Sequence, residues 1–156
     1  MKRLTRIILL STAATLALVG ALIYRGHAFG NNKFSNAHRR WQSASVTHYR
    51  FNLRVACFCA FTDKMPMTIE VKDGQIVSIH YSDGTPVSAQ DQLMFERYIT
   101  IDKMFDFTAQ SLKDADQIEI VYDPTYGFPS TVQIDFIKQA ADDELGLFVT
   151  DFQALQ

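Results

Sequence analysis

Residues 49–59, YRFNLRVACFC, decide the fold class that the sequence predicts. Large apolar side chains occupy every second position from Tyr49 to Val55, and the positions between them are basic or polar. A period of two is typical of a β-strand that has one face on a hydrophobic core and the other in water. The alternation continues to Cys57 and Cys59. The sequence therefore predicts a half-buried strand with both thiols on its inner face.

Two more strands are predicted on either side of Asp73-Gly74. A two-residue turn would place Val71 opposite Ile76 and divide the apolar side chains between the two faces. A three-residue loop over residues 72–74 brings them together on one face, with Gly74 at a positive φ. We therefore expect the three-residue loop, with one apolar face formed by Met67, Ile69, Val71, Val77 and Ile79.

Two amphipathic helices are predicted, one before the first strand and one in the middle of the chain. Apolar residues recur at helical spacing over residues 34–44, where Trp41 is the main anchor, and over residues 100–112, which Thr100 caps. A loop is expected at residues 82–90, and the later strands at residues 118–123, 131–137 and 145–152. We predict an α+β fold, an antiparallel sheet with helices packed on one face, in which a helix-plus-three-strands pattern occurs twice.

The N-terminal segment predicts export. Residues 7–24 carry no charge and follow three basic side chains, Lys2, Arg3 and Arg6. This length is at the lower limit for spanning a bilayer, and the positive flank would keep the N-terminus cytoplasmic. A cleaved signal peptide is the alternative. We therefore expect residues 1–30 to be a membrane anchor or signal with a linker. The domain of residues 31–156 would lie in the periplasm, held by one inner-membrane span, or it would be periplasmic or secreted after signal cleavage.

The charge distribution excludes some partners. All 17 acidic side chains lie after residue 30, together with only 11 of the 15 basic ones. A domain of this balance lacks the basic stripe of a nucleic-acid binder, and it would not dock on anionic lipid. We therefore expect no nucleic-acid partner, and contact with the membrane only through the N-terminal segment.

The function predicted from motifs is non-catalytic. The sequence contains no nucleophile elbow, no glycine-rich phosphate loop and no His-x-x-x-His pair. We expect a binding or scaffolding module without a cofactor, whose partner is another envelope protein or a small ligand. The alternative is a thiol-redox or metal-binding envelope protein.

Cys57 and Cys59 are the candidates for thiol chemistry. Two positions apart on a strand, their Cα atoms would lie about 6.6–6.8 Å apart, at the far edge of disulfide geometry. An oxidising compartment favours a bridge, which a kink at the strand end would allow. Buried free thiols and a metal or redox site are the alternatives.

Acidic side chains near the C-terminus are the weak candidates for a metal site: Asp123, Asp135, Asp142 and Asp143. Carboxylate oxygens suit calcium, but the D-x-D-x-D-G loop is missing. A solvated charged turn is the alternative interpretation of this run.

The loop of residues 124–129 is the candidate contact surface. It holds two aromatic side chains, Tyr126 and Phe128, between prolines. The alternative is that one or both rings cap the core, as most large aromatic residues do.

Spaced segments of residues 41–152 resemble an uncharacterised bacterial envelope family, domain of unknown function 6174. The matching residues are Trp41, Tyr49-Arg50-Phe51, Cys57-Phe58-Cys59, Val71 with Asp73-Gly74, Thr100-Ile101-Asp102 with Phe105-Asp106, Tyr122-Asp123 with Gly127-Phe128-Pro129, Ile134-Asp135, and Asp142-Asp143-Glu144. The resemblance implies the envelope compartment and the extent of the domain. It implies no activity or catalytic residue, and this chain lacks the lipidation cysteine that many members carry.

Overall fold

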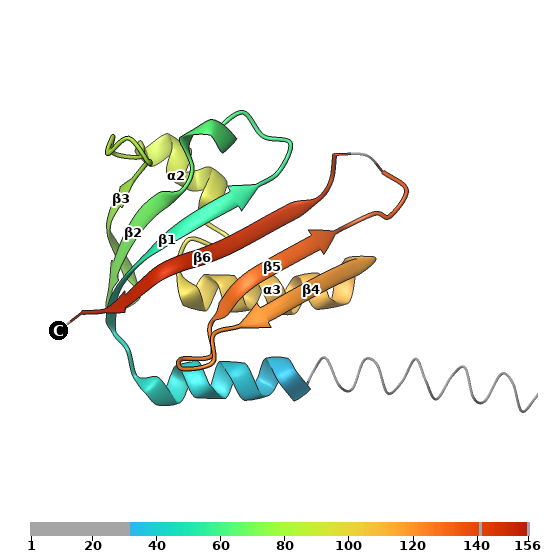
Figure 1. Ribbon diagram of the computed structural model, residues 1–156, viewed down its shortest axis with the longest axis horizontal. Coiled ribbons are helices and arrows are strands. Elements are labelled where there is room, and N and C mark those ends of the chain that lie inside the picture. Colours follow the sequence, from blue (N-terminus) through green and yellow to red (C-terminus); the bar gives the residue numbers. More distant parts are fainter. Residues whose placement is uncertain (1–31, 141, 156) are drawn as a thin grey trace, which may run out of the picture. The chain divides into compact units, whose positions relative to one another are not determined.

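The computed structural model describes residues 32–140 and 142–155 (Figure 1). The chain divides into two units between Asn36 and Ala37, and the fold below is that of the second unit. The predicted anchor or signal over residues 1–30 lies outside the described residues. Within the described ranges, no helix is long and apolar enough to cross a membrane.

One six-stranded antiparallel sheet forms the frame of the second unit. Its strands are β1 (His48–Ala56), β2 (Met67–Lys72), β3 (Gln75–His80), β4 (Gln117–Tyr122), β5 (Pro129–Asp135) and β6 (Leu145–Ala154). Their order in the sheet is β3-β2-β1-β6-β5-β4. Each half of the chain therefore forms a three-stranded meander, and the halves meet where β1 pairs with β6. This arrangement confirms the predicted α+β class and its twofold pattern.

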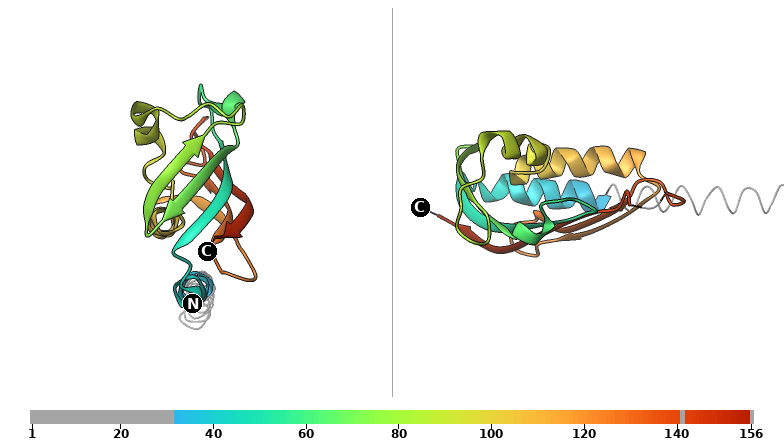
Figure 2. Two further views of the ribbon diagram at one scale, coloured as in Figure 1. Left: turned by 90° about the vertical axis from the view of Figure 1, so that its left-hand side faces the viewer. Right: turned by 90° about the horizontal axis from the view of Figure 1, so that it is seen from above.

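Helices cover one face of this sheet, as predicted. The right-hand view of Figure 2 shows residues 37–44 of the N-terminal helix, which spans 32–44, and α3 (Ile101–Asp114) on the same side of the strands. Thr100 caps α3, since its hydroxyl accepts the N–H of Lys103 at 3.2 Å. The short α2 (Ala89–Phe95), capped by Ser88, was not predicted. A single 3₁₀ turn, η1 (Thr62–Lys64), follows β1.

The core lies between the helices and the inner face of the sheet. The alternation in β1 is confirmed, because Tyr49, Phe51, Leu53 and Val55 are all at most 1% exposed. The other strands add Met67, Ile69, Val71, Ile79, Val132, Ile134, Leu147 and Val149, all buried.

The β2–β3 turn differs from the prediction. Val71 lies opposite Ile76, so the turn has two residues, Asp73 and Gly74, and the predicted three-residue loop is wrong. Both turn residues have positive φ, 50° and 75°, as a type I′ turn requires. The positive φ predicted for Gly74 is confirmed.

A β-bulge corrects the register that this turn alone would produce. Val71 pairs with Ile76 but Glu70 pairs with Ser78, so Val77 is the extra residue on β3. Its side chain is 56% exposed, not inward as predicted. Beyond the bulge Ile79 returns to the inner face, opposite Ile69.

Two aromatic side chains, those of Trp41 and Tyr49, join the N-terminal helix, β1 and the start of α3. Trp41 Nε1 donates to Asp102 Oδ1 at 2.9 Å, and the hydroxyl of Tyr49 accepts the backbone N–H of Ile101 at 3.1 Å. The rings of Trp41 and Tyr49 meet edge to face, with centroids 5.4 Å apart. Trp41 is therefore the anchor that the sequence predicts, and it holds helix to helix as well as helix to sheet.

Candidate functional site

The face of the sheet opposite the helices is polar. Thr68 Oγ1 donates to Asn52 Oδ1 at 2.9 Å, and Asn52 Nδ2 donates to Asp151 Oδ2 at 2.8 Å, which links three adjacent strands. Arg50 donates to the Gln153 side chain at 3.0 Å. The polar side chains on this half of the face therefore form hydrogen bonds with one another across the strands.

A hollow of about 370 Å³ opens at the other end of this face. Its floor is a row across four strands in which Glu119 pairs with Gln133, Gln133 with Gly146, and Gly146 with Ala56. The ring of Phe148 also lines it. The hollow is therefore built by cross-strand pairing of short and polar side chains.

Gly146 makes room for the ring of Phe148, which lines the hollow. A Cβ at this position would lie 2.7 Å from the Phe148 ring and 3.4 Å from Ala56 Cβ. The guanidinium of Arg54, the cross-strand partner of Phe148, lies 4.0 Å from the centroid of that ring. A glycine inside a strand often marks a close approach of another group, and here the ring of the same strand occupies the place.

The hollow is acidic. Three carboxylates, those of Glu119, Asp135 and Glu144, line it, and no lysine or arginine is among its lining residues. Asp135 Oδ1 is buried and has no hydrogen-bond partner among the described residues. Carboxylates beside apolar surface suit a ligand that carries an ammonium or guanidinium group on an apolar chain.

The weak metal candidates lie in different parts of the structure. Asp123 Oδ1 instead accepts the backbone N–H groups of Thr125 and Tyr126, at 2.9 and 2.6 Å, and so shapes the turn after β4. Asp135 lies in the hollow, while Asp142 and Asp143 belong to the connection between β5 and β6. In the described part of the chain, no group of three or more His, Cys, Asp or Glu is placed to hold a metal ion.

The predicted contact loop packs inward. Phe128 is 3% exposed, and its ring lies 4.6 Å from that of Phe152 and 6.2 Å from that of Trp41. Tyr126 is half-buried against Phe152, with centroids 5.0 Å apart. Phe128 is therefore a core residue and not a contact residue, because the loop folds back over the aromatic cluster.

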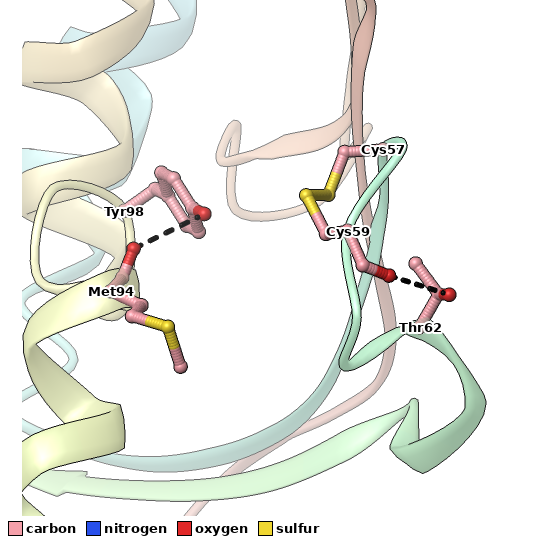
Figure 3. The surroundings of a disulfide bond; sticks show 5 residues. All are labelled: Cys57, Cys59, Thr62, Met94 and Tyr98. Carbon is pink, nitrogen blue, oxygen red and sulfur yellow. Dashed lines mark hydrogen bonds between the residues drawn. A yellow bond between two sulfur atoms is a disulfide. The ribbon is translucent and has the colours of Figure 1, made fainter. Parts of the chain in front are cut away.

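Cys57 and Cys59 are joined by a disulfide, with Cα atoms 5.2 Å apart. β1 ends at Ala56, earlier than predicted, so the chain is no longer extended where the bridge forms. Figure 3 shows the sulfur atoms on the side of the loop that faces Met94 and Tyr98. Thr62 Oγ1 donates to the Cys59 carbonyl at 3.1 Å, which ties the bridge to η1.

Sequence reasoning missed the hollow. Gln117 and Glu119 are polar at alternate positions of β4, and Gly146 lies inside a predicted strand. These were the available signals, since an interior glycine weakens a strand unless something needs the space. Whether these residues lie side by side depends on the order of the strands in the sheet, and the periodicity of a single strand does not predict that order.

These features define the class of protein: an α+β domain of two helix-plus-meander halves, in which no helix of the described ranges covers the second face of the sheet. The chain matches the model of the "Family of unknown function (DUF6174)" over residues 33–154, and it belongs to that family. No curated protein and no solved structure matches the chain. The match confirms the family resemblance.

Proposed function

We propose that this protein is a non-catalytic binding module whose hollow between β4, β5 and β6 takes a lysine- or arginine-bearing polypeptide segment. The observation that carries the proposal is the hollow itself, in which three carboxylates surround apolar surface on the helix-free face. An ammonium or guanidinium group would pair with Glu119 or Glu144, and its methylene stem would lie on the apolar surface of the hollow.

The electrostatics of the chain support a cationic ligand. Residues 100–156 hold most of the acidic excess, and they supply nine of the ten residues that line the hollow. Like charges gathered in a concave site raise the local concentration of an opposite charge and speed its association. The interaction should therefore weaken as salt is added.

The module's place in this proposal is the bacterial cell envelope. The uncharged run of residues 7–24 behind three basic side chains supports export, by an inner-membrane anchor or a cleaved signal. A disulfide is compatible with this, since such bonds persist in oxidising compartments. A phosphatase fused after Gln156 should be active in cells. An inactive phosphatase with an active cytoplasmic reporter at the same point would contradict export.

The binding test is calorimetric titration of the full-length chain with two capped pentapeptides, one of alternating lysine and leucine and one of alternating glutamate and leucine. The lysine peptide should bind and the glutamate peptide should not. Glu119→Gln and Glu144→Gln should each weaken binding up to about fivefold, the upper size of an exposed ion pair. Gly146→Ala should weaken it too, because the added methyl group displaces the Phe148 ring.

The matched control is Glu70→Gln, which removes a carboxylate from the same face outside the hollow. It should leave the affinity for the lysine peptide unchanged. Equal losses from Glu70→Gln and Glu119→Gln would mean that only the net charge attracts the peptide, and the hollow would lose its role.

A further inference from the structure

The Cys57–Cys59 disulfide lies outside the packed core. No residue from 57 to 66 is buried, and both cysteines are partly exposed. The bond closes a loop of only three residues, so it restricts the unfolded chain very little. Because both cysteines are partly exposed, the bond lies where an incoming thiolate can approach it.

Phe58, between the two cysteines, is exposed to solvent. Its side chain is 85% exposed, the most exposed of the large hydrophobic side chains among the described residues. An aromatic side chain in this position is a ready anchor for an apolar partner, since its burial gains free energy at little cost in side-chain entropy. Phe58 is the neighbour in sequence of both cysteines, so a segment bound on its ring would lie beside the disulfide loop.

We infer that the Cys57–Cys59 disulfide is a thiol–disulfide exchange site that oxidises a pair of thiols in an apolar polypeptide segment docked on Phe58. This activity goes beyond the proposed binding module, and it uses none of the residues that line the hollow. Residues 57–60 contribute no buried side chain to the core, so the chain around the bond can adjust during the exchange.

The reaction balances without a further oxidant. One thiolate of the segment attacks a sulfur atom of the bridge, the bond between Cys57 and Cys59 breaks, and a mixed disulfide forms while the other cysteine leaves as a thiolate. The second thiolate of the segment then attacks the mixed disulfide. The segment ends with an internal disulfide, and its two electrons and two protons end on Cys57 and Cys59.

The test is a single-turnover reaction of the oxidised full-length chain with a synthetic peptide that carries two cysteines around a Leu-Phe-Leu spacer. Acid quenching, alkylation and mass spectrometry follow both partners. The chain should oxidise this peptide about tenfold faster than oxidised glutathione does at equal concentration, because docking on an aromatic anchor raises the local thiol concentration. A peptide with a Ser-Gly-Ser spacer should lose that advantage.

Phe58→Ser separates docking from reactivity. It should slow oxidation of the Leu-Phe-Leu peptide to the rate of the polar peptide, while the reaction with dithiothreitol stays unchanged. Val77→Ser, at another exposed apolar residue, is the matched control and should alter neither rate.

Two results would overturn the inference. The first is oxidation of the apolar peptide no faster than by glutathione, which would make the bridge a local brace of its loop. The second is an equal slowing of both dithiols by Phe58→Ser, which would mean that Phe58 shapes the bridge and does not dock the segment. The peptide titration of the hollow is unaffected by either result, so the two proposals fail separately.

Discussion

Replacing Tyr49 by phenylalanine tests how β1 and α3 are joined. Tyr49 is 1% exposed, and its hydroxyl accepts the backbone N–H of Ile101 at 3.1 Å. Ile101 is the first residue of α3 and is completely buried, so this N–H has no acceptor inside the helix and no access to water. Tyr49→Phe removes the acceptor and leaves the donor. We expect the free energy of unfolding at pH 7 to fall by about 1–3 kcal/mol, the cost of an unsatisfied buried donor.

Urea unfolding followed by tryptophan fluorescence measures this change. Trp41 is the only tryptophan of the chain, and its ring meets the Tyr49 ring edge to face at 5.4 Å, so it reports on the same cluster. The midpoint should fall while the slope stays constant, since the buried area barely changes. Tyr122→Phe is the control, because Tyr122 is half-buried and its hydroxyl makes no hydrogen bond within the described ranges, where burial alone perturbs its pKa. Equal midpoints for the two variants would refute the reasoning.

The same tyrosines predict how stability depends on alkaline pH. Burial raises the pKa of Tyr49 well above its ordinary value of 10.0, and burial raises the pKa of Tyr122 to about 12. A folded-state pKa above the unfolded value contributes stability in full below the unfolded pKa, and this is lost as pH rises above it. The free energy of unfolding should therefore be level to about pH 9 and fall from about pH 10 upward. Each Tyr→Phe variant should fall less steeply, and a slope equal to that of the parent chain would contradict the assignment.

Two further predictions concern glycine and the disulfide. Gly127 and Gly74 both have positive φ, 86° and 75°, but a Cβ at Gly127 would strike the backbone carbonyl of Ala37, whereas a Cβ at Gly74 meets nothing within 4 Å. Gly74→Ala should lower the free energy of unfolding by about 1–2 kcal/mol through backbone strain. Gly127→Ala should lower it by at least about 1 kcal/mol more, because the added methyl group also meets the helix. Equal urea midpoints for the two variants would disprove the helix contact. Reduction of Cys57–Cys59 should lower stability by no more than about 1.6 kcal/mol, the chain-entropy value for a three-residue loop, and a loss above about 3 kcal/mol would show that the bridge supports the core.

Local periodicity was enough to predict the class of fold. The alternation from Tyr49 to Val55 and the helical spacing around Trp41 each follow from the direction in which neighbouring side chains leave the backbone. The helix start at Thr100 is likewise local, since a hydroxyl caps an N–H only three residues away. The inner face of β1, the twofold pattern and the capped helix were therefore all available without the tertiary structure.

The hairpin shows where local reasoning ended. Both registers satisfy the turn at Gly74, and the apolar pattern alone favoured the wrong one. The bulge exposes the side chain of Val77 to solvent, and it leaves Ile79 buried in the core. The choice between a turn and a bulge depends on how β2 is already held against β1, which is a contact between distant parts of the chain.

By itself the sequence determined which side chains of β1 face the core, because alternation is a property of a single strand. Only the tertiary structure decided which strands lie side by side. Ala56, Glu119, Gln133 and Gly146 come from four separate strands, and they form one row only because β1 pairs with β6 at one particular register. Phe128 is buried because of a similar long-range contact. Its loop packs onto a helix almost ninety positions earlier in the chain. Pairing between distant segments is set by the fit of the whole sheet and core, and no local pattern records that fit.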